Sequence, residues 1–352
     1  MTKNSWPVLL SALLAGEDLS REGSSWAMRQ IMSGEASEGQ IGAFMMALRS
    51  KGETVDELSG LVDVMLENAV LLDTGNDAVD IVGTGGDLIG TVNISSMASI
   101  VAAAANTPVL KHGSRSASGK TGSSEMLEVL GIRLDLAPGQ IAEVFRGVGI
   151  TFFFAPVFHP AMRFVGPIRK QLGVPTTFNF LGPLANPAQP IATALGVADP
   201  KIAPLMAREL AARGRSGLVF RSDDGLDELS ITAPNTVWEV SLGNVTEHRL
   251  VEFVRPEASL EQLIGGDAKH NAKVAQRLFA GETGAEFKAI RDIVALNAAA
   301  GMVAYELAKN PSSASEDLAA RLEKNISLAH EAIESGAAQN LTNIWSQATQ
   351  QY

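Results

Sequence analysis

The chain has 352 residues, of which 46% are hydrophobic and 19% charged, and it contains no cysteine. This length and composition predict a globular protein with one large domain and a smaller one. The net charge of −11 argues against a nucleic-acid-binding surface, and the lack of cysteine excludes disulfides, thiolate nucleophiles and cysteine-ligated zinc. These features fit a cytoplasmic protein, which we expect.

The first seventy residues are predicted to be helical throughout. Apolar residues recur there at helical spacing, and residues 37–40 (Ser-Glu-Gly-Gln) and 54–57 (Thr-Val-Asp-Glu) have the spacing of capping boxes. Ser5 is expected to cap the first helix, which Gly16 ends. Because a helical piece this small needs a partner surface, we expect it to pack within the chain or against a second subunit.

From residue 79 onward, strand-like runs alternate with helical stretches, which predicts a mostly parallel sheet with helices on its faces. The last two runs alternate like antiparallel strands. In such sheets, ligands bind beyond the carboxyl ends of the strands. The predicted strands are Val79–Val82, Val109–Leu110, Ile150–Ala155, Ala194–Val197, Gly217–Phe220, Val237–Val240 and Val245–Leu250.

Further helices are predicted between and after these strands. Asn93 is expected to cap one of them, and the Gly-Gly-Asp run at 265–267 is expected to cap another. Residues 88–110 carry no charge, but their asparagines, serines and proline exclude a membrane span. The predicted helices are Ile94–Ala105, one within Phe158–Leu172, Ala268–Phe279, about Lys288–Lys309 and Ser315–Ser335.

One stretch, Gly83–Glu125, carries the chemistry. It opens with Gly-Thr-Gly-Gly-Asp directly after a strand, where backbone N–H groups can approach an anion with no Cβ in the way. The helix that follows adds its N-terminal dipole. The next strand delivers Lys111 and a second loop rich in serine and glycine. A glycine turn alone is often only a tight connection, and this one matches neither common nucleotide-binding pattern; the two loops together predict a ligand with two phosphate groups.

The glycine motif, Asn-Ile-Ser-Ser at 93–96 and Lys-His-Gly at 111–113 resemble the signature of the anthranilate phosphoribosyltransferases. The resemblance continues through His159–Arg163, Asn179–Leu184 and Gly225–Glu228, so it spans most of the chain in the family's order. It implies a small all-helical domain and a large α/β domain of the nucleoside phosphorylase and phosphoribosyltransferase type. The implied domains are 1–73 joined by roughly 158–188, and 74–157 with 189–352.

This family transfers a 5-phosphoribosyl group from phosphoribosyl pyrophosphate (PRPP) to the amine of anthranilate and releases pyrophosphate, in tryptophan biosynthesis. The resemblance implies a Mg²⁺-dependent enzyme with two ions, held by Ser95, Asp227 and Glu228. Carboxylates are hard ligands that suit magnesium bridged to phosphates. Without the family, Asp227–Glu228 is more typical of an exposed acidic turn.

The resemblance also assigns substrate contacts. Gly83, Ser114 and Arg169 are assigned to anthranilate, and Arg169 would hold its carboxylate through two parallel hydrogen bonds; by itself, Arg169 is as well explained as a surface arginine at a helix C-terminus. His112 and Lys111 are the candidate catalytic residues, and His112 would orient the acceptor or take up a late proton. The residues assigned to PRPP are Gly83, Gly86, Asp87, Thr91, Asn93, Ile94, Ser95, Ser96, Lys111, His112, Gly113, Ser114, Arg115, Ser116, Ala117, Ser118, Gly119 and Ser123.

The chain departs from the usual family pattern in the second loop. Ser114 replaces an asparagine, Gly119 replaces a serine, and Ser124–Glu125 replaces Ala-Asp. We expect a homodimer that binds PRPP and anthranilate, with no nucleic-acid or membrane partner. Three alternatives stay open: the same transfer to a different aromatic acceptor, a non-catalytic nucleic-acid-binding relative, and a pyrimidine nucleoside phosphorylase. The net charge argues against the second, and the Lys-His-Gly run against the third.

Overall fold

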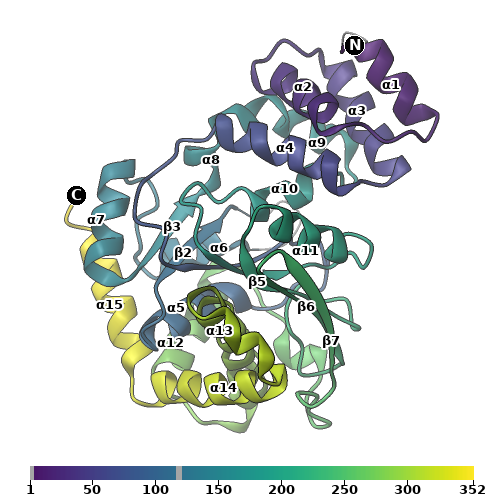
Figure 1. Ribbon diagram of the computed structural model, residues 1–352. Helices are drawn as coiled ribbons and strands as arrows, with labels where there is room; N and C mark the ends of the chain where they lie inside the picture. Colours follow the sequence, from purple (N-terminus) through teal and green to yellow (C-terminus); the bar gives the residue numbers. More distant parts are fainter. Residues whose placement is uncertain (1–3, 116–120) are drawn as a thin grey trace. The chain divides into compact units, whose positions relative to one another are not determined.

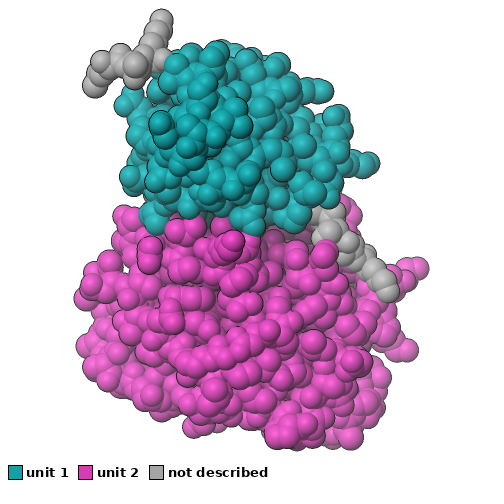
Figure 2. Space-filling view, turned by 90° about the vertical axis from the view of Figure 1, so that its right-hand side faces the viewer, with its two compact units in different colours: residues 1–71, 155–187 teal, residues 72–154, 188–352 magenta. Residues whose placement is uncertain are grey.

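The computed structural model describes residues 4–115 and 121–352 (Figure 1). The chain divides into two compact units, coloured separately in Figure 2. Unit 1 comprises Met1–Leu71 and Ala155–Pro187, and unit 2 comprises Leu72–Phe154 and Ala188–Tyr352. Unit 1 is helical and unit 2 is an α/β unit built on a mostly parallel sheet, which confirms the predicted fold class.

Unit 1 contains helices only, from two separate stretches of chain. Both predicted capping boxes are present: Ser37 with Gln40, and Thr54 with Glu57. Trp6 packs edge-on against Trp26 and Phe44 and thereby ties the first three helices together. The elements are α1 (Trp6–Leu14), α2 (Arg21–Met32), α3 (Glu38–Lys51), α4 (Val55–Glu67), α8 (Ala155–Phe158), η1 (Pro160–Phe164), α9 (Gly166–Leu172) and α10 (Phe178–Leu184).

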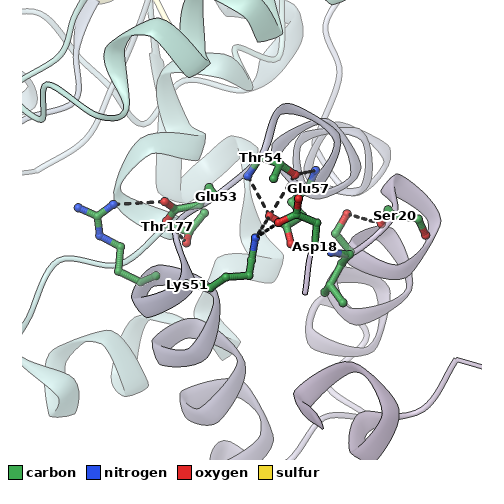
Figure 3. A network of polar contacts seen from close by, with 10 residues as sticks. Asp18, Ser20, Lys51, Glu53, Thr54, Glu57 and Thr177 are labelled. Atoms are coloured by element: carbon green, nitrogen blue, oxygen red, sulfur yellow. Dashed lines mark hydrogen bonds and ion pairs between the residues drawn. The ribbon is translucent and has the colours of Figure 1, made fainter. Parts of the chain in front are cut away.

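A polar network joins these stretches inside unit 1 (Figure 3). Besides capping α4, the buried Glu57 accepts hydrogen bonds from the Leu19 amide (2.8 Å) and from Lys51 Nζ (3.0 Å). Thr177, from the second stretch, donates to Glu53 at 2.6 Å. Buried carboxylates are tolerated when their oxygens are paired in this way, and the network therefore fixes the geometry of the unit.

His159 lies at the start of η1 with 3% of its surface exposed. Burial lowers the pKa of this histidine from 6.5 to about 4, so the folded state favours the neutral ring. Between pH 6.5 and 4 the unfolded chain binds more protons than the folded chain. Stability therefore falls as the pH falls, by about 3 kcal/mol in total from this group.

We expect the variant His159→Gln to lose less stability than the parent protein between pH 7 and pH 4.5. Urea unfolding at both pH values measures this, with His270→Gln, an exposed position on α12 (Ala268–Phe279), as the matched control. An equal acid-induced loss in His159→Gln and in the parent would show that His159 is not the responsible group.

Unit 2 is organised around a seven-stranded sheet in the order β3-β2-β1-β4-β5-β6-β7. The first five strands in this order run parallel, and β6 and β7 extend the sheet antiparallel, as predicted. The order reverses between β1 and β4, and such a switch point places a crevice outside the strand ends. The strands are β1 (Val79–Gly83), β2 (Val109–Gly113), β3 (Ile150–Phe154), β4 (Ala192–Gly196), β5 (Ser216–Ser222), β6 (Asn235–Ser241) and β7 (Asn244–Leu250).

Helices cover the sheet, with α13 on one side and α11 on the other (Figure 1). The apolar α13 lies so close to β1 that a Cβ at Gly301 would overlap the side chain of Ile81. None of the helices within the described residues is both long and apolar enough to cross a membrane. The helices of unit 2 are α5 (Ile94–Ala104), α6 (Ser123–Val129), α7 (Pro138–Val148), α11 (Ala203–Ala212), η2 (Leu260–Leu263), α12 (Ala268–Phe279), η3 (Ala285–Phe287), α13 (Lys288–Lys309), η4 (Pro311–Ser315), α14 (Leu318–Glu334) and α15 (Ala337–Thr349).

The predicted start of one helix is three residues too early. The helix expected from Ser315 begins at Leu318, because the Asp317 side chain accepts a hydrogen bond from the Ala320 amide (3.0 Å) and caps it there. Ser315 instead closes the short turn η4. The Gly-Gly-Asp cap is confirmed, since Asp267 accepts from the His270 amide at 2.8 Å.

Candidate active site

The first glycine loop runs from the end of β1 to the start of α5. Gly85 and Gly86 have φ values of +68° and +87°, which side-chain-bearing residues rarely adopt, so the turn requires glycine at both positions. Asp87 Oδ1 accepts a hydrogen bond from the Ile89 amide at 3.2 Å. Further along, Thr91 forms a β-bridge with Ile264. The loop is thus held at both ends and presents its glycines at the switch point.

Asn93 precedes α5 but does not cap it, contrary to the prediction. Its side chain instead donates to the Thr121 carbonyl (3.4 Å) and accepts from Asn271 Nδ2 (2.9 Å). The α5 N-terminus is met by a different group, because the Ser95 amide donates to Glu228 Oε1 at 3.1 Å. A carboxylate at this position is favoured by the dipole of the helix.

Asp227 and Glu228 follow β5 and lie beside the first loop. Asp227 Oδ2 accepts a hydrogen bond from the Gly85 amide (2.7 Å), and both side chains are buried, with 9% and 8% of their surfaces exposed. Gly83 and Gly196 end the neighbouring strands β1 and β4. A Cβ on either glycine would overlap Asp227: its carboxylate in the first case and its backbone carbonyl in the second. Glycine is therefore required at both strand ends.

The site holds more negative charge than the protein neutralises. Burial and the nearby Asp87 carboxylate raise the pKa of Asp227 to about 7. Burial, together with the charge of Asp227, raises the pKa of Glu228 well above its usual value, although Lys111 acts in the opposite direction. Burial also raises the pKa of Asp87. Such crowding of carboxylates favours a bound cation, which would lower each of these pKa values.

Asp227, Glu228 and Ser95 have the chemistry to hold a magnesium ion. Asp227 and Glu228 offer hard oxygen ligands beside Ser95, whose amide already orients Glu228. No group of three His, Cys, Asp or Glu side chains in residues 4–115 and 121–352 is arranged to hold a metal ion. Magnesium commonly binds to one or two carboxylates and takes its other ligands from phosphates and water.

Lys111 lies inside β2 and not in the loop after it, which corrects the predicted strand end at Leu110. β2 stays paired with β3 as far as Gly113, so the second loop begins at Ser114. The Lys111 ammonium, on a side chain that is 2% exposed, donates to the Ile81 carbonyl (2.6 Å) and to Ser95 Oγ (3.4 Å). Burial lowers its pKa, while the carboxylates of Asp80 and Glu228 oppose that shift. The Lys111 ammonium thus lies next to Ser95, one of the candidate metal ligands.

The described residues of the second loop lie next to the end of β2. A Cβ at Gly113 would overlap the Ser123 hydroxyl (2.5 Å), which donates to the carbonyl of the exposed Ser114 (3.3 Å). Arg115 pairs with Glu128 at 3.1 Å and lies over the Phe154 ring. Ser116, Ala117, Ser118 and Gly119 lie outside the described residues.

Three further predicted site residues are buried, besides Lys111, Asp227 and Glu228. His112 donates its amide to Asp80 Oδ1 (3.1 Å), and its side chain is in the interior. The Ile94 side chain is part of the core at the start of α5. The Ser96 hydroxyl is also buried, with no hydrogen-bond partner among the described residues. Any contact of these side chains with a ligand therefore requires local rearrangement.

Arg169 belongs to α9 in unit 1. Its side chain is partly buried, and burial lowers its pKa. Within the described residues, its guanidinium has no hydrogen bond or ion pair, unlike that of Arg49 in the same unit, which pairs with Glu53 (3.2 Å). A partly buried guanidinium whose N–H groups have no protein acceptor among the described residues is suited to bind an anionic ligand.

Two family models match the chain. Residues 75–339 match the α/β domain of a glycosyl transferase family, and residues 7–69 match its helical bundle domain. The anthranilate phosphoribosyltransferase of Leifsonia xyli subsp. xyli is 54% identical over 347 residues, which are 98% of each chain. The chain belongs to the anthranilate phosphoribosyltransferase family.

Solved structures of anthranilate phosphoribosyltransferases have the same fold. The crystal structure from Thermus thermophilus is 39% identical, with a TM-score of 0.86 and coverage of 97% of this chain and 99% of that chain. A Saccharomyces cerevisiae structure in complex with PRPP and Mg is 25% identical, with a TM-score of 0.86 and coverage of 99% and 98%. Another structure of the yeast enzyme is in complex with 4-fluoroanthranilate and has a TM-score of 0.83, at the same identity and with 99% of each chain covered.

Sequence reasoning missed several residues that shape this site. Asp80 holds the His112 amide, and Gly196 leaves room for Asp227. Thr121 and Asn271 bind the Asn93 side chain. The second glycine motif, Gly265–Asp267, was the available signal for Asn271, since it resembles the first motif and opens the helix that carries this residue.

Proposed function

We infer that this chain transfers the 5-phosphoribosyl group of PRPP to the amine of anthranilate and releases pyrophosphate, as in tryptophan biosynthesis. The main support is structural: Asp227 is hydrogen-bonded to the first glycine loop and Glu228 to the N-terminus of α5. The chain is also 54% identical to the anthranilate phosphoribosyltransferase of Leifsonia xyli subsp. xyli. The PRPP and Mg complex of the yeast relative supports the donor, and its 4-fluoroanthranilate complex supports the acceptor class.

In this reaction, the amine nitrogen forms a bond to C1 of the ribose as the bond from C1 to the pyrophosphate oxygen breaks. Positive charge develops on the sugar ring and negative charge on the leaving group. Magnesium, when bound, neutralises that negative charge. The Gly85 and Ser95 amides already donate to Asp227 and Glu228. The other N–H groups of the glycine loop and of the first turn of α5 would bind the phosphates. The amine is neutral at pH 7, so the proton it loses is released late. His112 is our candidate to receive this proton, after a local rearrangement that exposes its buried ring.

Asp227, Glu228 and the Ser95 hydroxyl are the proposed magnesium ligands, and we propose two ions. The crowded carboxylates support a dication at this position, and a second ion would be held mainly by the pyrophosphate itself. We further propose a cytoplasmic homodimer. The domains we propose are residues 1–73 with about 158–188, and 74–157 with 189–352, on the basis of the two compact units.

The proposed PRPP residues are those named from the sequence, with their main roles revised by the geometry. Gly83 and Gly86 allow the conformation of the first loop, and Lys111 donates a hydrogen bond to the Ser95 hydroxyl. Gly83, Ser114 and Arg169 remain the proposed anthranilate residues. Because Ser114 is exposed and shorter than the asparagine usual at this position, a different aromatic acceptor is the second candidate function.

The test of this function is the loss of anthranilate fluorescence in the presence of PRPP and Mg²⁺, with omission of each component in turn. We expect turnover only when all are present. Substituted anthranilates and other aromatic amines compared by kcat/KM separate the two candidate acceptors. If another aromatic amine is turned over and anthranilate is not, the transfer to a different acceptor is favoured. If no amine shows PRPP-dependent turnover, the proposal is refuted.

Arg169→Ala is expected to weaken the use of the acceptor and to leave the KM for PRPP nearly unchanged. The lost charge-assisted contact should cost roughly 1.5–3 kcal/mol, or about ten- to a hundredfold in kcat/KM for anthranilate. Steady-state kinetics with each substrate varied measures this. Lys170→Ala, an exposed neighbour on α9, is the control. Equal losses for both substrates would assign Arg169 to the fold or to the phosphates.

A further inference from the structure

Four residues beside the substrate loops form a closed ring of hydrogen bonds. The Gly266 amide donates to Asn271 Oδ1 (2.8 Å), and Asn271 Nδ2 donates to Asn93 Oδ1 (2.9 Å). Asn93 Nδ2 donates to the Thr121 carbonyl (3.4 Å), and the Thr121 hydroxyl donates to the Gly266 carbonyl (3.0 Å), which closes the ring. A backbone amide can only donate, so the orientations of both asparagine amides follow from the first bond.

The ring connects three segments that are distant in sequence. Asn93 ends the first glycine loop, Thr121 lies near the end of the second loop, and Asn271 lies in the first turns of α12. Asn271 is 1% exposed, so its amide is shielded from water that would compete for these bonds. A ring of this kind fixes the distance between the ends of the two loops.

Backbone contacts attach the same segment to the first loop. The Val92 amide donates to the Leu263 carbonyl, and the Gly265 amide donates to the Gly90 carbonyl, each at 2.9 Å. A Cβ at Gly265 would come within 2.8 Å of both the Asn271 carboxamide oxygen and the Thr91 carbonyl. The second glycine motif therefore has a role beyond capping α12, because it lets this segment lie directly against the first loop.

We propose that Asn271 is a positioning residue that holds the two phosphate-binding loops in the arrangement PRPP requires. The inference rests on the proposed function, since the ligand of the two loops is PRPP there. When two loops move independently, a ligand that contacts both must order them. The free-energy cost of that ordering lowers the affinity of the ligand. The ring removes part of this cost before binding, and so its loss should affect PRPP far more than the acceptor.

The test compares Asn271→Ala with two other variants. Thr121→Val breaks the ring at a different bond and keeps the shape of the side chain. Asn325→Ala removes another buried helical asparagine of unit 2, whose Nδ2 donates to Glu306 and to the Arg321 carbonyl, away from the loops. The measurements are PRPP affinity by calorimetry with Mg²⁺ present, steady-state kinetics for both substrates, and Tm.

Asn271→Ala removes two of the ring's hydrogen bonds. We expect it to weaken PRPP binding at least about tenfold, with the anthranilate KM at saturating PRPP changed less than about twofold. Thr121→Val should act in the same direction, and the double variant should lose less than the product of the two single losses. Asn325→Ala should lower Tm without changing PRPP affinity. If Asn271→Ala does not fold, Thr121→Val alone carries the comparison.

PRPP affinity unchanged in Asn271→Ala or in Thr121→Val would overturn the proposal, as would equal losses for both substrates. Measurement of the parent protein distinguishes a failure of this proposal from a failure of the proposed function. A parent that does not bind PRPP refutes both, whereas a parent that binds and turns over PRPP, with variants that bind it equally well, refutes only the role of the ring.

Discussion

Replacement of Asp227 and Glu228 together by alanine is expected to abolish turnover, with a loss in kcat of roughly a thousandfold or more. The reason is that these two buried carboxylates are the proposed ligands of the magnesium that would neutralise the negative charge of the leaving group. Steady-state turnover over a range of Mg²⁺ concentrations measures the effect. The isosteric variants Asp227→Asn and Glu228→Gln separate lost charge from lost packing.

Asp223→Asn is the matched control for this experiment. Asp223 lies four residues before Asp227 in the same segment, but it is exposed and pairs with Arg249 on β7. An exposed pair of this kind contributes about 1 kcal/mol or less, so activity should stay near that of the parent. Magnesium-dependent turnover near the parent level in the double alanine variant would rule out the proposed role of the two acids.

Gly196→Ala is expected to have the second largest effect. The added Cβ would overlap the backbone carbonyl of Asp227, which cannot move aside as a flexible side chain can. The segment with both acids must therefore shift, and we expect a loss of at least about a hundredfold in kcat/KM, since displacement by about 1 Å at a catalytic site can cost that much. Activity assays and thermal unfolding together measure the change.

Gly147→Ala, on the exposed side of α7, provides the control for an added methyl group. A Cβ there meets nothing within 4 Å, and alanine in a helix is favoured over glycine by up to about 1 kcal/mol. Its Tm should therefore stay level or rise. If Gly196→Ala retains full activity, the strand-end glycines are not needed to place Asp227, and our description of the site is wrong at that point.

The fold was largely predictable because its local signals are strong. Capping boxes at residues 37–40 and 54–57 mark helix starts that the structure confirms, and the alternation after Val79 indicated the parallel sheet and its two antiparallel additions. The boundary of α14 was missed because Asp317 and Ser315 are both good cap residues, and only the three-dimensional structure shows which hydroxyl or carboxylate meets the first turn.

The candidate site was predictable in its residues but not in their contacts. Lys111 was expected in a loop because a lysine within a buried strand is uncommon, and its reach to Ile81 and Ser95 depends on neighbouring strands. Asn93 was expected to cap α5 because capping is a local interaction, whereas its actual partners lie 28 and 178 residues away. Long-range contacts of this kind leave no periodic signal in a sequence.

The stoichiometry of the reaction tests the central claim most directly. Anthranilate consumed and pyrophosphate released should be measured in the same reaction, with the product identified by mass spectrometry. We predict one pyrophosphate per anthranilate and a product with the mass of anthranilate in which one amine hydrogen is replaced by the 5-phosphoribosyl group. Neither change should occur without Mg²⁺. Pyrophosphate released with anthranilate left intact would contradict the account, as would anthranilate unchanged with PRPP and Mg²⁺ both present.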